Sequence, residues 1–214
     1  DNTVALLGAT GLVGKRLLSA LQESKHQVVV FSRHPFAGHT SDSVVWQRLP
    51  SISAPTAEVI DVKCRIWICA APIWVLPEYF ELFEKSGACR VVALSSTSRY
   101  TKTDSPDKYE QDTVSRLRIG EERLQSWAES KGIEWVILQP TLIYGYGQDK
   151  NITEIARIIK RCGFFPLLGE ASGLRQPVHA DDLALACIAA VNIPAAKNRV
   201  FKLSGGEILS YRDM

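Results

Sequence analysis

Three glycines spaced three residues apart near the start of the chain could hold a phosphate group. The segment Val4-Ala5-Leu6-Leu7-Gly8-Ala9-Thr10-Gly11-Leu12-Val13-Gly14 places an apolar run before the first of them and a helical pattern after the last. Glycine lets the backbone approach an anion closely, and a helix N-terminus offers unpaired N–H groups and a partial positive charge. Because a strand precedes this turn and a helix follows it, the segment predicts a phosphate cradle.

The elements that must position this turn alternate between strands and helices. Short apolar runs rich in Val and Ile are typical of strands covered on both faces, so we expect a parallel sheet with helices on both sides. Strands are expected at 4–7, 27–31, 44–46, 66–70, 90–94 and 135–138. Helices are expected at 12–22, 77–85, 114–131, 152–160 and 183–190, and the polar stretch 99–112 is expected to be a surface loop.

Composition and charge exclude several classes of protein. The 214 residues fit one domain, and the net charge of +2, with both signs dispersed, argues against a nucleic-acid partner. The longest apolar run, 66–77, is shorter than the ~20 residues of a membrane span. Five cysteines without a Cys-x-x-Cys pair are typical of buried, reduced thiols in a cytoplasmic protein, and no metal site is expected.

Five motifs in order now identify a family resemblance. Gly-Ala-Thr-Gly-x-x-Gly is followed by Ala-Ala-Pro at 70–72, Ser-Ser-Thr at 95–97, Pro-Thr-Leu-Ile-Tyr-Gly at 140–145 and Val-His-Ala-Asp-Asp-Leu-Ala at 178–184. Together they resemble the extended short-chain dehydrogenase/reductase superfamily, and within it the nucleotide-sugar epimerase/dehydratase group. The resemblance implies a Rossmann-like α/β fold, a doubly wound parallel sheet with a small C-terminal substrate lobe.

The resemblance also implies how the chain is divided. Residues 1–144 would form mainly the dinucleotide-binding part and residues 145–214 mainly the substrate lobe, intertwined as one domain. Ser210-Tyr211-Arg212-Asp213 has the form of a helix capping box one residue before the chain stops, so we expect a truncated C-terminus. Pairing of two long helices into a homodimer is common in this family.

A nicotinamide dinucleotide is the cofactor that the resemblance implies. Five residues of the glycine turn would line its pyrophosphate, namely Gly8, Thr10, Gly11, Leu12 and Val13. Ala70, Ala71 and Pro72 would pack along the cofactor, and Ser95 would lie near the nicotinamide ribose. Tyr144 would border the nicotinamide, or would be a core aromatic residue.

The end of the second strand favours NADP over NAD. NAD-binding proteins usually place an acidic residue there to accept hydrogen bonds from the adenine ribose. This chain has Ser32 and Arg33 instead. A guanidinium group can grip a 2′-phosphate that a carboxylate would repel, so we expect NADP(H), with NAD as the alternative.

The expected catalytic residues depart from the family pattern. Thr97, with Ser96 as alternative, would polarise the reacting oxygen, but the Tyr-x-x-x-Lys pair is missing from the helix at 114–131. The family often has a Glu four residues after the Lys. Anchoring on Glu122 puts Val114 and Arg118 at the Tyr and Lys positions.

Anchoring on Glu121 instead puts Thr113 and Leu117 there, and neither register restores a phenol. Arg118 could supply a fixed charge, or could be a solvated residue paired with Glu122. The proton would then move through Tyr109, Tyr100, a water or a substrate group.

The substrate lobe offers two candidate contacts. Arg175 would contact the phosphates of a nucleotide, or would be an ordinary surface residue, and Asn151 sits where related enzymes touch substrate. Asp181 is expected to cap the following helix, with His179 in a structural role. These features predict an NAD(P)(H)-binding oxidoreductase or epimerase acting on a nucleotide-sugar or similar polar metabolite. The alternative is a non-catalytic dinucleotide-sensing protein of the same fold.

Overall fold

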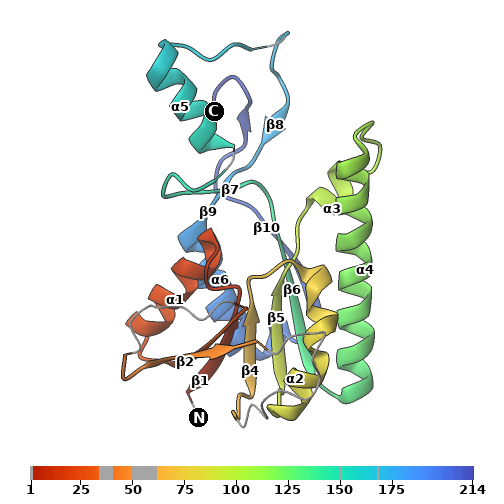
Figure 1. The fold of residues 1–214 in the computed structure, drawn as a ribbon. Coiled ribbons are helices and arrows are strands. Elements are labelled where there is room, and N and C mark those ends of the chain that lie inside the picture. The colour runs from red at the N-terminus through yellow and green to blue at the C-terminus, as the bar shows by residue number, and fades with distance from the viewer. Residues whose placement is uncertain (1, 34–40, 50–61, 150, 168) are drawn as a thin grey trace.

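A parallel sheet forms the centre of the computed structural model, which describes residues 2–33, 41–49, 62–149, 151–167 and 169–214 (Figure 1). Among these residues, seven strands pair in the order β10-β6-β5-β4-β1-β2-β3, and every pairing is parallel. The strands are β1 (Thr3–Leu7), β2 (Gln27–Ser32), β3 (Val44–Arg48), β4 (Ile66–Cys69), β5 (Arg90–Leu94), β6 (Glu134–Pro140) and β10 (Arg199–Leu203). The order 3-2-1-4-5-6 is that of the Rossmann fold, as the sequence predicts.

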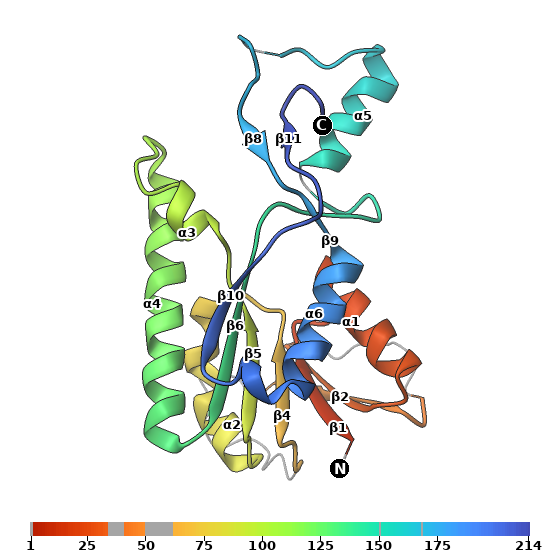
Figure 2. The same cartoon turned by 180° about the vertical axis from the view of Figure 1, so that it is seen from behind.

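Helices cover both faces of this sheet. On one face α1 (Leu12–Glu23) packs against α6 (Ala180–Asn192), and the other face carries α2 (Phe80–Lys85) and α4 (Lys108–Lys131) (Figures 1 and 2). The segment before α2 is a 3₁₀ helix, η1 (Ile73–Tyr79), so the helix expected at 77–85 begins earlier and in a tighter form. A second 3₁₀ turn, η2 (Pro194–Ala196), follows α6.

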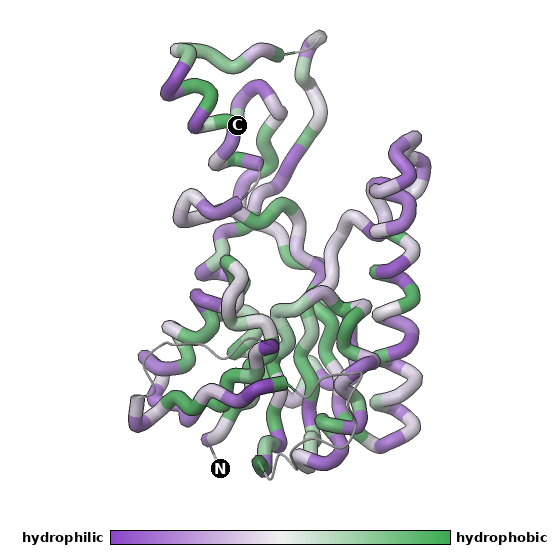
Figure 3. Tube along the Cα trace, viewed as in Figure 1, coloured by the Kyte–Doolittle hydropathy of each residue, from purple (hydrophilic) through white to green (hydrophobic). Residues whose placement is uncertain are grey.

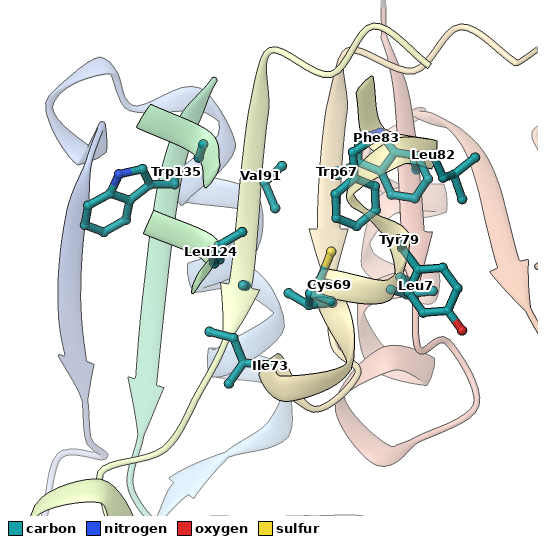
Figure 4. Close-up of a cluster of buried hydrophobic side chains, with 14 of the residues drawn as sticks. Leu7, Trp67, Cys69, Ile73, Tyr79, Leu82, Phe83, Val91, Leu124 and Trp135 are labelled. Atoms are coloured by element: carbon teal, nitrogen blue, oxygen red, sulfur yellow. The ribbon is translucent and has the colours of Figure 1, made fainter. Parts of the chain in front are cut away.

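The alternation of side chains along each strand divides the core into two layers. Even-numbered positions such as Leu6 and Ile68 pack towards α1 and α6, whereas odd-numbered positions such as Leu7 and Trp67 pack towards η1, α2 and α4. Figure 4 shows the second layer, in which Trp67 lies against Phe83 with ring centroids 4.4 Å apart. Apolar residues gather along the strands of the main sheet (Figure 3). The burial on both faces explains why the strand sequences are continuous apolar runs.

Helix α4 begins six residues before its expected start, and this corrects the surface loop expected at 99–112. Asp107 accepts a hydrogen bond from the Tyr109 N–H at 2.8 Å and caps the helix. The short helix α3 (Ser98–Thr101) forms within the same stretch. The Ser, Lys and Asp residues that suggested a loop therefore serve as caps and ion pairs, such as Lys102 with Glu110 at 2.5 Å.

The C-terminal third of the chain contributes to both parts of the molecule. Strand β10, which the sequence did not predict, extends the main sheet beside β6, with Leu203 opposite Pro140. The smaller part beyond the sheet consists of α5 (Ile152–Cys162) and four two-residue strands: β7 (Ile143–Tyr144), β8 (Leu174–Arg175), β9 (Val178–His179) and β11 (Leu209–Ser210). Figure 2 shows α5, β8 and β11 of this lobe on the far side of β9 from the main sheet. No described helix is both long enough and apolar enough to cross a membrane.

The cysteines divide between the core and the surface. Cys64, Cys69 and Cys187 are buried, whereas Cys89 and Cys162 are exposed, which corrects the expectation that the thiols are buried. Burial raises the pKa of Cys64 to about 11, so this thiol stays protonated.

The packing of α4 on the sheet gives a test of stability. Leu124 is fully buried between α4 and the sheet, whereas Ile119 on the same helix is 48% exposed. Leu124→Ala should lower the free energy of unfolding by about 2–5 kcal/mol because it leaves a cavity. Ile119→Ala should change it by less than about 0.5 kcal/mol. Urea unfolding followed by tryptophan fluorescence measures both, and equal losses would contradict this packing.

Candidate functional site

The glycine turn after β1 is closed by backbone contacts that only glycine permits. Gly8 has φ +90°, and a Cβ added there would lie 2.4 Å from Ala71 N, on the turn that follows β4. A Cβ on Gly14 would lie 2.0 Å from the Gly8 carbonyl oxygen. Glycine at these two positions therefore brings the start of α1 tightly against the ends of β1 and β4.

The N-terminus of α1 is suited to an anion. Gly11 is the N-cap and makes no side-chain capping hydrogen bond, and the first turn holds no acidic residue. A Cβ on Gly11 would meet only the Gly8 carbonyl oxygen, at 3.9 Å, so this side of the turn is open. Thr10 is exposed, Leu12 is half-buried and Val13 is buried. The turn thus combines first-turn N–H groups with room for a phosphate.

This turn lies where the strand order of the sheet reverses. The chain runs outwards from β1 to β2 and β3 on one side, and from β4 to β5 and β6 on the other. Ligands of open α/β sheets bind outside the carboxyl ends of the strands at such a point. Ala70 and Ala71 follow β4 there, and the exposed Arg33 follows β2. The arrangement brings the residues expected to hold the cofactor to one edge of the sheet.

Ser95, Ser96 and Thr97 follow β5 at the same edge, and their hydroxyls have different partners. Ser95 Oγ donates to the carboxylate of Glu121. Ser96 Oγ accepts from the Ser98 N–H at 3.1 Å. Thr97 Oγ1 donates to the Pro140 carbonyl at 3.2 Å. The side chain of Ser96 thus contacts the start of α3, that of Thr97 contacts the end of β6, and that of Ser95 contacts α4.

Glu121 of α4 is the most deeply buried charged group of this region. Its side chain is 0% exposed and forms an ion pair with Arg99. Gln139 Nε2 donates to its Oε1 at 2.9 Å, beside the hydroxyl of Ser95. The carboxylate therefore joins α4 to the residues after β5 and at the end of β6. Burying a charge is costly unless it is paired and hydrogen-bonded, and this one has three partners.

The burial of Glu121 favours one of the two registers that the sequence left open. Glu122, the alternative anchor, has a side chain that is 60% exposed. With Glu121 as the inward residue, Thr113 and Leu117 occupy the helical positions of the missing Tyr and Lys. The Thr113 hydroxyl bonds to the Tyr109 carbonyl at 2.9 Å and Leu117 is buried. Helix α4 therefore presents neither a phenol nor an ammonium group at these positions.

Arg118 and Tyr109 lie on the outer side of α4. Arg118 Nε faces Glu122 Oε1 at 3.8 Å, and Tyr109 is 78% exposed. Among the described contacts, none joins either residue to Thr97. Their catalytic roles stay predictions, and the geometry favours the reading of Arg118 as a solvated residue.

A polar cluster connects α1 to the start of the small lobe. Arg16 Nε binds Asp181 Oδ1 at 2.5 Å and stacks on the ring of Tyr146 at 4.4 Å. The Tyr146 hydroxyl donates to Asp181 Oδ2 at 2.6 Å, and with Arg16 it holds the pKa of Asp181 below its usual range. The expected cap of α6 needs correction, because His179 is the N-cap and accepts from the Asp181 N–H. Tyr144 packs edge-on against His179, with centroids 5.1 Å apart.

The two expected substrate contacts lie in the small lobe. Asn151 precedes α5 without capping it, because Asp149 accepts the N–H groups of Asn151 and Thr153. Arg175 of β8 is exposed, and its guanidinium bonds to the Leu174 carbonyl at 2.8 Å. Neither contact tests a role in substrate binding.

Three residues of the site escaped the sequence analysis. Arg99 falls in a polar stretch, whereas Gln139 and Lys202 stand next to apolar residues near the ends of β6 and β10. Their importance depends on contacts between segments far apart in the chain, for which a single sequence carries no signal. The one available hint was Glu121 itself, a carboxylate on the helical face that also carries Leu117 and Leu124.

Comparison with known proteins identifies the family. Residues 3–144 match a family model described as "Semialdehyde dehydrogenase, NAD binding domain". The chain belongs to this family of NAD-binding domains. The matched residues include the glycine turn and six strands of the main sheet, β1 to β6.

Individual relatives agree with the resemblance to the epimerase/dehydratase group. The chain is 24% identical over 242 aligned positions to a UDP-glucose 4-epimerase of Vibrio cholerae, covering 99% of this chain and 73% of that protein. A UDP-glucuronic acid 4-epimerase of Bacillus cereus, solved with NAD, shares the fold with a TM-score of 0.77 at 18% identity, over 99% of this chain and 81% of that one. A UDP-glucose 4-epimerase of Thermotoga maritima, solved with UDP-glucose, gives 0.74 at 15% identity, over 99% and 79%.

The ion pair beneath the site gives a second test of stability. Arg99→Met would leave the Glu121 carboxylate buried without its cation, and should cost about 3 kcal/mol of unfolding free energy. Adding Glu121→Gln should recover most of that loss, because the buried charge is then gone. A double-mutant cycle in urea measures the coupling. Single and double variants of equal stability would contradict the pairing.

Proposed function

We propose that the protein is an NAD(P)(H)-dependent enzyme that oxidises and reduces, or epimerises, a carbinol of a nucleotide-linked sugar. The observation that carries the proposal is the open glycine turn at the strand-order reversal, where an uncapped helix N-terminus faces the edge that also bears Ser95–Thr97. Neighbouring strands are ~4.8 Å apart, so the ends of β1 and β5 are about 10 Å apart, within the length of a dinucleotide. Relatives named as UDP-sugar epimerases support the choice of substrate class.

Residues of the chain can be assigned to each part of the dinucleotide. The glycine turn with Thr10, Leu12 and Val13 would hold the pyrophosphate, and Ala70, Ala71 and Ser95 would line the path towards the nicotinamide, which Tyr144 would border. When bound, the nicotinamide ring supplies the acceptor and donor of hydride. In the small lobe, Asn151 and Arg175 are proposed to contact the sugar nucleotide.

Thr97, with Ser96 beside it, is proposed to hydrogen-bond the reacting oxygen of the sugar. Both side chains are half-buried at the end of β5. When the Thr97 hydroxyl turns its hydrogen away from the Pro140 carbonyl, it can donate to the reacting oxygen as that oxygen gains negative charge, which lowers the barrier of the reaction.

Removing the hydroxyl of Thr97 tests this role. Thr97→Ala should lower kcat about 10²-fold on the best of three probes, UDP-glucose, UDP-N-acetylglucosamine and UDP-glucuronic acid, because it removes a donor to developing charge. Thr97→Ser keeps the hydroxyl and should retain most of the rate. Turnover is followed by product analysis with NAD and with NADP. Equal rates for wild type and Thr97→Ala would show that the Thr97 hydroxyl does not bond the reacting oxygen. Either Ser96 or no hydroxyl after β5 would then do so.

Arg33 is proposed to favour NADP by binding the 2′-phosphate of its adenosine. Arg33→Ala should weaken NADPH binding about tenfold, equivalent to ~1.4 kcal/mol, and leave NADH binding nearly unchanged. Arg116→Ala is the matched control, since Arg116 pairs with Asp112 on the surface of α4. Fluorescence titration measures both affinities. An unchanged ratio of NADPH to NADH affinity would remove the basis for an NADP preference.

A second candidate function is a non-catalytic dinucleotide-binding protein. Thr113 and Leu117 at the positions of the missing helix pair favour it, because neither side chain can transfer a proton. Dinucleotide binding without turnover of any of the three probes would support this candidate over the enzyme.

A further inference from the structure

A phenol flanked by cations lies next to the site, in α3 and not at the helical positions of α4 where the family has its Tyr and Lys. Tyr100 belongs to α3, which follows Ser95–Thr97 and packs beside α4 (Figure 1). Its backbone N–H bonds to the Thr97 carbonyl at 2.9 Å, so the two residues belong to one tight turn. The residue is 47% exposed, so a ligand can reach the phenol.

Two positive charges face the ring of Tyr100. Lys202 Nζ lies 4.2 Å from the ring centroid, and the guanidinium carbon of Arg99 lies 5.5 Å from it. Lys202 comes from β10, at the edge of the main sheet, and Arg99 is anchored by its ion pair with Glu121. Cations at these distances are attracted to the ring face and would stabilise negative charge on the phenol oxygen.

The oxygen of Tyr100 also has a fixed hydrogen-bond donor. Gln139 Nε2 lies 3.3 Å from the hydroxyl oxygen and 2.9 Å from Glu121 Oε1. The carboxylate accepts only, so it fixes the amide with its NH₂ group towards both oxygens. Tyr100 Oη is therefore the acceptor in this contact, and its own hydrogen can be directed to another group.

We propose that the acid/base function of this site resides in α3, where Tyr100 exchanges the proton of the substrate hydroxyl and Arg99 and Lys202 supply the charge. The inference rests on the function proposed above and names the residues that would carry it out. In the oxidation direction Tyr100 starts as the phenolate, and its Oη takes the proton of the sugar hydroxyl as the hydride on the same carbon leaves for the oxidised dinucleotide. Tyr100 is then a phenol, and its hydrogen returns to the sugar oxygen in the reverse direction. The carbinol becomes a ketone, and the reverse transfers restore an alcohol.

The test compares two tyrosines and two lysines. Tyr100→Phe should lower kcat at least 10²-fold on the active UDP-sugar probe. The KM, the NADH dissociation constant and the unfolding midpoint should stay close to those of the wild-type protein. Lys202→Met should lower kcat by a smaller factor, and Lys202→Arg, which keeps a cation beside the ring, should retain most of the rate. Tyr109→Phe and Lys160→Met are the comparators, and both should lose far less than their counterparts.

The outcomes separate the two proposals. Wild-type protein that turns over none of the probes would overturn the proposed function, and this inference with it. Turnover by wild type that survives Tyr100→Phe, or that is lost instead in Tyr109→Phe, would overturn the inference alone. If Tyr100→Phe weakened NADH binding by as large a factor as it lowered kcat, Tyr100 would be a cofactor-binding residue, and the inference would also be overturned.

Discussion

The buried carboxylate of Glu121 is the interaction on which the arrangement of the site depends. A charge with no exposed surface requires partners, and Ser95, Arg99 and Gln139 supply them from the residues after β5 and the end of β6. This requirement fixes the rotation of α4 about its axis and the position of α3. It also places Leu117 against the core, where an ionisable side chain would need a partner of its own. The residues next to the site are therefore those that the buried carboxylate of Glu121 requires as partners.

The proposed cofactor half and the proposed catalytic half of the site depend on different kinds of contact. The glycine turn is a local feature, in which φ +90° at Gly8 and the close contact of Gly14 with it depend on neighbouring residues. The residues around Tyr100 come from α3, β6 and β10, which are separated by up to a hundred positions in the chain. Because a fold does not fix the chemistry of its site, a dinucleotide-binding fold can carry different acid/base residues.

Local patterns therefore predicted much of the fold and little of the chemistry. Apolar runs located six strands of the sheet. The turn after Leu7 predicts an anion site, and that site stays a prediction. Strand β10 was missed because Arg199 and Lys202 face outwards from an edge strand and break its apolar pattern. The start of α4 was missed because the capping role of Asp107 reads as loop composition. The environment of Glu121 emerges only when α4, β5 and β6 are packed together.

The central claim is that a dinucleotide held at the glycine turn presents its reactive ring to Tyr100. A crystal structure of the protein with NAD and UDP-glucose tests it most directly. The account predicts the pyrophosphate on the N–H groups at the start of α1, and a sugar hydroxyl within hydrogen-bond distance of Tyr100 Oη. A pyrophosphate bound elsewhere, or a sugar hydroxyl bonded to another acid or base with Tyr100 facing solvent, would contradict it.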